Sequence, residues 1–85
     1  MTINDLAKKL CVMYKNAAYS EKSLMIRLFG IHFASEIRAA KITPLEIIKY
    51  ANNRYDASLT EHYQTEINKG IKLSKYVVLR NDIKI

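Results

Sequence analysis

The sequence predicts a mostly α-helical fold: a compact bundle of four to five helices that ends in a short C-terminal β-hairpin or strand. Only two glycines and one proline interrupt the 85 residues, so long helices are permitted almost everywhere. A hydrophobic fraction of 49% is that of a globular chain, and this length has room for one modest core. We therefore expect residues 1–85 to form a single domain.

The first helix is predicted over residues 3–17. Thr2 and Asp5 form a weak capping pair ahead of it. Apolar residues then recur at helical spacing: Ile3, Leu6, Ala7, Leu10, Tyr14 and Ala17. Three lysines fall on the outer face as a solvated surface: Lys8, Lys9 and Lys15. Val12 also points outward, whereas Cys11, the only cysteine, is expected to be a buried and inert thiol.

A second helix is predicted to begin at a Ser20 cap and to be apolar on nearly every side between residues 24 and 33. Gly30 interrupts it and has two interpretations. It either lets a neighbouring element pack closely or marks a break into a short third helix around residues 32–40. We favour the break.

Residues 43–76 contain two further helix starts. Thr43 and Glu46 form a capping box, with Pro44 suited to the first turn of the helix. Ser58 and Glu61 form a second box, which predicts a helix over residues 58–69 with an apolar stripe and a left-handed stop at Gly70. The stripe consists of Leu59, Tyr63 and Ile67. Two helices in tandem indicate a helix-turn-helix-like pair within the bundle.

The remaining fold predictions concern the core and the C-terminus. The core residues are expected to be Leu10, Leu24, Leu28, Ile31, Ile48, Tyr63 and Ile67. Residues 75–80 and 83–85, separated by Asn81 and Asp82, predict the hairpin. The apolar surface of Val12, the second predicted helix and the hairpin is more than one small core can cover. We therefore expect a homodimer, with a monomer as the open alternative.

Composition limits the function classes. The net charge of +6 favours an acidic partner, either nucleic acid or an acidic protein surface. No phosphate loop, serine elbow or paired carboxylates are visible, so we do not expect an enzyme or a cofactor. His32 and His62 lack the further ligands of a metal site. Apolar runs are too short for a membrane span, and we expect a cytoplasmic protein.

The candidate site is the polar face of the helix predicted over residues 58–69. Glutamine and asparagine can bond adenine bidentately, and threonine can contact a thymine methyl. The candidate base-edge readers are Glu61, Gln64, Thr65 and Asn68, and the candidate phosphate contacts are Lys49, Arg54, Lys69, Lys72 and Lys75. The alternative is that a surface helix simply shows polar residues to water, and both interpretations stay open.

Three segments carry a family resemblance: LFGIHFASEI at 28–37, PLEII at 44–48 and TEINKGIKLSKYV at 65–77. They resemble the small bacterial helix-turn-helix-like domain proteins, over roughly residues 28–79. The resemblance implies a compact helical domain with a DNA-binding type of core, often in stand-alone bacterial or phage proteins. One departure is the connection at residues 52–58, which is longer than the usual 3–4-residue turn and would change how the following helix is presented.

We therefore predict a DNA-binding helix-turn-helix-like protein that regulates transcription and contacts double-stranded DNA. The alternative is a small protein-binding module, such as an inhibitor, adaptor or antitoxin-like partner from a mobile element, that does not bind DNA. Salt-dependent binding to random duplex DNA separates the two, because only the first requires it.

Overall fold

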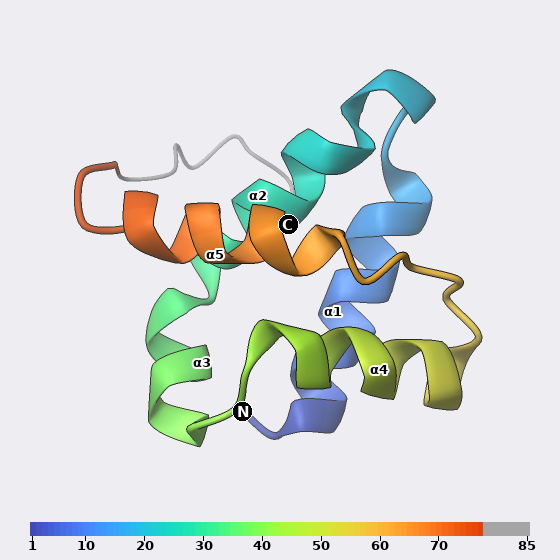
Figure 1. Cartoon of the computed structure of the whole chain (residues 1–85), viewed down its shortest axis with the longest axis horizontal. Coiled ribbons are helices and arrows are strands. Elements are labelled where there is room, and N and C mark those ends of the chain that lie inside the picture. The colour runs from blue at the N-terminus through green and yellow to red at the C-terminus, as the bar shows by residue number, and fades with distance from the viewer. Residues whose placement is uncertain (78–85) are drawn as a thin grey trace.

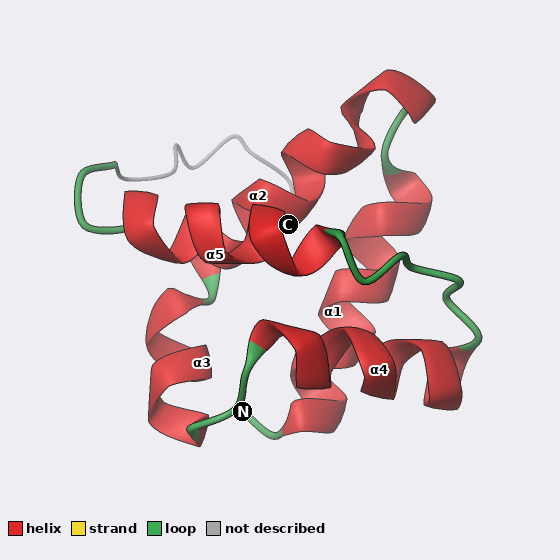
Figure 2. Ribbon diagram, viewed as in Figure 1, coloured by secondary structure: helices red, strands yellow, loops and turns green. Residues whose placement is uncertain are grey.

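The computed structural model of the protein describes residues 1–77 and contains helices joined by short connections (Figures 1 and 2). Five α-helices lie in this part of the chain: α1 (Ile3–Asn16), α2 (Lys22–His32), α3 (Ala34–Ala40), α4 (Pro44–Tyr55) and α5 (Tyr63–Leu73). A 3-10 helix, η1 (Tyr19–Glu21), precedes α2. Residues 1–77 hold no strand, which confirms the mostly helical prediction. The predicted hairpin falls mainly on residues 78–85, outside the described residues.

Helix α1 begins at a complete capping box. The Thr2 hydroxyl accepts a hydrogen bond from the backbone N–H of Asp5 at 3.2 Å, and the Thr2 N–H donates to the Asp5 carboxylate at 3.0 Å. Two otherwise unpaired donors of the first turn are thereby satisfied. At the other end, the Lys22 ammonium donates to the Tyr14 carbonyl oxygen at 2.8 Å and lies over the Tyr14 ring. These contacts attach the end of α1 to the start of α2.

Two predictions for the second helix were wrong. Ser20 lies in η1 and does not cap α2, which begins at Lys22 without a side-chain cap. Gly30 does not break the helix: α2 continues to His32, and the break before α3 is at Phe33. A short third helix does follow, as predicted. Gly30 instead serves close packing, the other interpretation of this residue, because α5 crosses at this position.

Helix α4 confirms the second predicted cap. The Thr43 hydroxyl accepts from the Glu46 N–H at 3.2 Å, the Thr43 N–H donates to the Glu46 carboxylate at 3.0 Å, and Pro44 occupies the first turn. A three-residue turn, residues 41–43, joins α3 to α4. Lys41, at the start of this turn, adopts the left-handed conformation with φ 56° and ψ 39°.

Helix α5 differs from the prediction at both ends. It begins at Tyr63, not at Ser58, whose φ of 58° is incompatible with a helix cap. The Asn52 side chain accepts from the Leu59 N–H at 2.7 Å and donates to the Leu59 carbonyl oxygen at 2.8 Å, so the loop takes the groups that an earlier helix would need. The predicted stop at Gly70 is also wrong, because α5 continues to Leu73.

The core is formed by side chains from all five helices and from the connection before α5. Of the predicted core, Leu10, Ile48 and Ile67 are fully buried. Leu28, Ile31 and Tyr63 are only half-buried. Leu24 is 49% exposed and is a wrong prediction, since it lies on the side of α2 opposite Ile26. A helix that is apolar all round cannot bury every face in so small a domain.

The helices form two layers. In Figure 1, α4 and α5 lie nearer to the viewer than α1 and α2, and α3 runs across the direction of α4 at one edge. Helix α5 packs most extensively on α2, and α4 packs on α1. The sides of α4 and α5 that face away from the back layer are therefore open to a partner.

Candidate nucleic-acid interface

Helix α5 exposes one polar and basic stripe. Ile67 and Gly70 are buried, while the opposite face carries Thr65, Asn68, Lys69 and Lys72, all exposed. Lys75 is exposed in the turn that follows the helix. The structure thus brings most of the predicted contact residues together. Their placement is what a phosphate-binding surface requires.

Four predicted residues stand apart from this stripe, and one of them, Lys49, lies on α4. Glu61 is exposed in the turn before α5, and Gln64 is half-buried in the first turn of the helix. Arg54 lies near the end of α4, on the other side of the seven-residue connection, with its guanidinium 5.3 Å from the centre of the Tyr55 ring. Arg54 does not belong to the same contact stripe as Lys69 and Lys72.

One ion-pair cluster fixes the inner edge of α5. The Arg27 guanidinium donates twice to one carboxylate oxygen of Glu66, at 3.0 and 2.8 Å, and the Lys69 ammonium lies 3.5 Å from the other oxygen. Burial raises the pKa of Glu66. The hydrogen bonds and charges of Arg27 and Lys69 lower the pKa by more than burial raises it, so the pKa lies below its ordinary value. Glu66 therefore stays charged and offsets part of the charge of Lys69.

The connection between α4 and α5 does not have helix-turn-helix geometry. Residues 56–62 are too many for the 3–4-residue turn of that motif, and α4 and α5 run in opposite directions in Figure 1. Asp56 and Ser58 both adopt positive φ, at 52° and 58°. The connection is longer than the usual turn, as expected, but it spans residues 56–62 and not 52–58, because residues 52–55 belong to α4.

Helix α4 presents a second exposed face, on which the sequence prediction included Lys49 but not Asn53. Ile47, Ile48 and Ala51 are buried. The solvent side carries Glu46, Lys49 and Asn53. In the sequence, only two residues separate the predicted third helix, ending near residue 40, from the Thr43 cap. This spacing permits only a tight turn, and it is the signal that points to α4.

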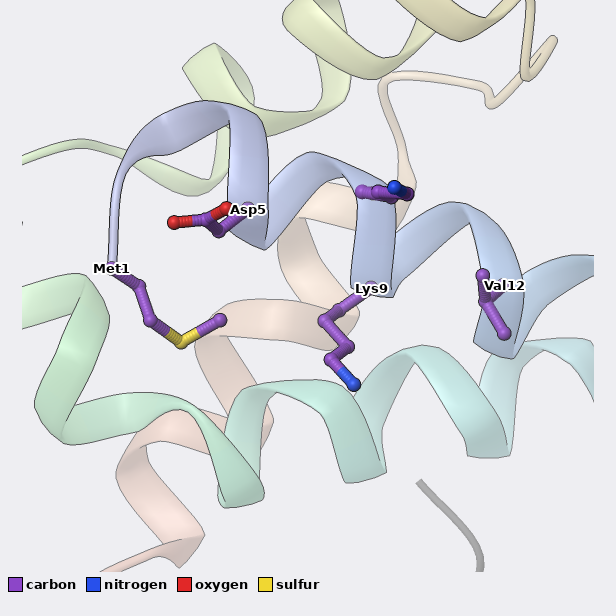
Figure 3. A pocket seen from close by; sticks show the side chains of 5 residues that line it. Met1, Asp5, Lys9 and Val12 are labelled. Atoms are coloured by element: carbon purple, nitrogen blue, oxygen red, sulfur yellow. The ribbon is translucent and has the colours of Figure 1, made fainter.

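A shallow groove runs along the outer side of α1, on a different element from α4 and α5 (Figure 3). Its volume is about 340 Å3. The lining residues are Met1, Asp5, Lys8, Lys9 and Val12. Backbone and hydroxyl hydrogen bonds from Thr2 lower the pKa of Asp5, so its carboxylate is charged beside the two ammonium groups. The groove thus combines apolar and charged contact groups.

Within residues 1–77 no group of three histidine, cysteine or acidic side chains is placed to hold a metal ion. No helix in the same part of the chain is long and apolar enough to cross a membrane. Cys11 is buried, as expected, and burial raises the pKa of its thiol.

Comparison with known proteins concerns almost the whole chain. A family model described as an HTH-like domain matches residues 2–80, a range that includes all five helices. No curated protein and no solved structure matches the chain. The match extends well beyond the residues 28–79 on which the resemblance rested. The protein belongs to the HTH-like domain family.

Proposed function

We propose that this protein binds double-stranded DNA and regulates transcription. The observation that supports the proposal is the exposed basic surface that a helix-turn-helix-like domain presents on α4 and α5. Lys49 lies on the first helix, and Lys69, Lys72 and Lys75 lie on or just after the second. The net charge of +6 has the sign that attracts a polyanion.

Lys69, Lys72 and Lys75 act as phosphate contacts. Each ammonium that neutralises a phosphate releases a condensed counterion, so the affinity falls as salt rises. Lys72 and Lys75 are exposed and near the C-terminal end of α5, where they can reach the DNA phosphates without disturbing the protein core. This contact type fixes the protein on the duplex but carries no sequence information.

A mobility-shift assay with mixed genomic fragments at several salt concentrations tests the proposal. Lys72→Ala and Lys75→Ala should weaken binding to all fragments alike and each lower the slope of log affinity against log salt by about one unit. Lys15→Ala, which removes the same charge from the exposed side of α1, is the matched control and should leave the slope unchanged. Absence of binding even at low salt, where screening is weakest, would reject DNA as the partner.

The protein acts as a homodimer in this proposal. Val12 and Leu24 are 47% and 49% exposed, and Tyr19 is 94% exposed, so apolar surface remains on α1, η1 and α2 that a second copy can cover. A twofold dimer would also present two equivalent DNA-binding surfaces. Light scattering over a range of concentrations should show the dimer mass, and a monomer mass at high concentration would refute this part.

A second candidate function is supported by the groove on α1. Lys8 and Lys9 beside Met1 and Val12 suit an acidic segment of another protein that also carries apolar side chains. In this candidate the chain is a small inhibitor, adaptor or antitoxin-like module that does not bind DNA. The mobility-shift assay separates the two, because this candidate requires no binding to random duplexes.

A further inference from the structure

The turn between α3 and α4 differs in kind from the connection between α4 and α5. Residues 41–43 redirect the chain in three residues, with Lys41 in the left-handed conformation and its N–H donating to the Arg38 carbonyl oxygen at 3.1 Å. The Thr43 capping box then starts α4 at once. In Figure 1, α4 leaves this turn across the direction of α3. Two helices joined in this way have the form of a helix-turn-helix, with α4 as its second helix.

The solvent face of α4 carries two side chains suited to reading bases. Lys49 and Asn53 are both exposed and lie four residues apart, so they are neighbours on one face of the helix. Lysine can contact the O6 and N7 atoms of guanine, and asparagine can bond N6 and N7 of adenine. The neighbouring Asn52 is not available, because its amide holds both backbone groups of Leu59.

The charges around this face favour a polyanion. The basic side chains between α3 and the end of α4 are Arg38, Lys41, Lys49 and Arg54, all exposed. Glu46 is the acidic residue on α4, and its carboxylate accepts the Thr43 N–H within the capping box. The negative charge is thus held at the start of the helix. Arg38 donates to the Ile71 carbonyl oxygen at 3.2 Å and the Arg54 guanidinium lies over the Tyr55 ring, whereas Lys41 and Lys49 are exposed and can approach phosphates.

The first turn of α5 is less suited to enter a groove. A helix that reads a groove needs exposed side chains where it meets the base edges. The first turn of α5 has instead Tyr63, half-buried with its ring centroid 5.6 Å from that of Tyr14, and Gln64, also half-buried. Packing of Tyr63 against Tyr14 of α1 leaves the first turn of α5 only partly accessible.

We infer that α4, rather than α5, is the helix that reads the major groove, with Lys49 and Asn53 as its base-contacting residues. Lys41 in the turn, and Lys69, Lys72 and Lys75 at α5, then contact the flanking phosphates. Thr65 and Asn68 lie beside those lysines and do not read bases. The inference rests on the proposed DNA binding and names the surface that gives it sequence preference.

Paired variants of the full chain test the assignment. A preferred site is first selected from a pool of random-sequence duplexes, and affinities are then measured for that site and for single-base changes within it. Asn53→Ala is paired with Asn68→Ala, and Lys49→Ala with Lys72→Ala, since each pair removes the same exposed group from α4 and from α5. Asn53→Ala and Lys49→Ala should each reduce discrimination by about 10- to 100-fold at one base position.

The α5 variants should behave differently. Asn68→Ala should leave discrimination unchanged, and Lys72→Ala should lower the salt slope by about one unit without changing base preference. Circular dichroism of all four variants checks that they fold as the wild type does. Loss of discrimination in Asn68→Ala but not in Asn53→Ala, or in none of the four, would overturn the inference while leaving DNA binding intact. Failure of the wild type to bind any duplex at low salt would instead overturn the proposed function and the inference with it.

Discussion

Gly30 of α2 and Gly70 of α5 lie against each other where the two helices cross. A Cβ atom on Gly30 would be 3.1 Å from the Cα atom of Gly70 and would overlap the Ile67 carbonyl oxygen. A Cβ atom on Gly70 would be 2.9 Å from the Cα atom of Gly30. The two backbones are thus in direct contact, which brings Arg27 within reach of Glu66 and makes α2 and α5 the most extensively packed pair.

Replacing Gly70 with alanine should destabilise the fold. The new methyl group would meet the backbone of α2, which cannot rotate away as a side chain can. Overpacking of this kind costs about 3 kcal/mol, and the higher helix propensity of alanine returns about 1 kcal/mol, so we expect a net loss of about 2 kcal/mol. Urea unfolding followed by circular dichroism measures it. Thr65→Ala, exposed on the same helix, should change stability by less than about 0.5 kcal/mol.

Truncation to alanine should destabilise the protein strongly at Ile67 and only slightly at Leu24. Ile67 is fully buried, so Ile67→Ala should lower the free energy of unfolding by about 2–5 kcal/mol. Leu24 is 49% exposed, and Leu24→Ala should change it by less than about 1 kcal/mol. Thermal or urea unfolding of both variants checks the assignment. Equal losses in the two variants would contradict the burial described here.

Two adjacent asparagines offer a matched test of the connection before α5. Asn52→Ala should cost about 1–3 kcal/mol, because it leaves the half-buried backbone groups of Leu59 without their partners. Asn53 is exposed, so Asn53→Ala should leave the unfolding free energy nearly unchanged. Urea midpoints compare the two variants directly. A stable Asn52→Ala protein would show that the connection holds its shape without this clamp.

The stability contribution of Glu66 should depend on pH. Its pKa is lowered in the folded state from the ordinary 4.5, so the charged carboxylate stabilises the protein above about pH 4.5 and this contribution is lost as pH falls through the folded pKa. Arg27 is 38% exposed, and solvent screening reduces the expected effect to about 1 kcal/mol.

Glu66→Gln should therefore lower the unfolding free energy by about 1 kcal/mol at pH 7. The gap to the wild type should narrow in acid, as the wild-type carboxyl takes up its proton. Urea unfolding at a series of pH values measures both. Glu61→Gln, at an exposed carboxylate in the turn before α5, is the control with little expected effect. A gap that stays constant from pH 7 to pH 3 would contradict the assigned ion pair.

Features encoded within a few residues were predictable from the sequence. The Thr43 and Glu46 box and the Thr2 and Asp5 box each close within four residues, so the starts of α4 and α1 are confirmed. The buried Ile67 followed from helical periodicity. The grouping of Asn68 with its neighbouring lysines on one exposed face followed from it too.

Features that depend on distant segments were decided only by the tertiary structure. Ser58 has the local pattern of a cap, yet Asn52 takes the Leu59 backbone groups into a loop and α5 starts later. Gly70 has the local pattern of a helix stop, yet it lies inside α5, where its lack of a side chain lets the helix approach Gly30, 40 positions earlier in the sequence. Local patterns specify which backbone groups can be satisfied nearby, whereas the competition between alternative partners is resolved only when the helices pack.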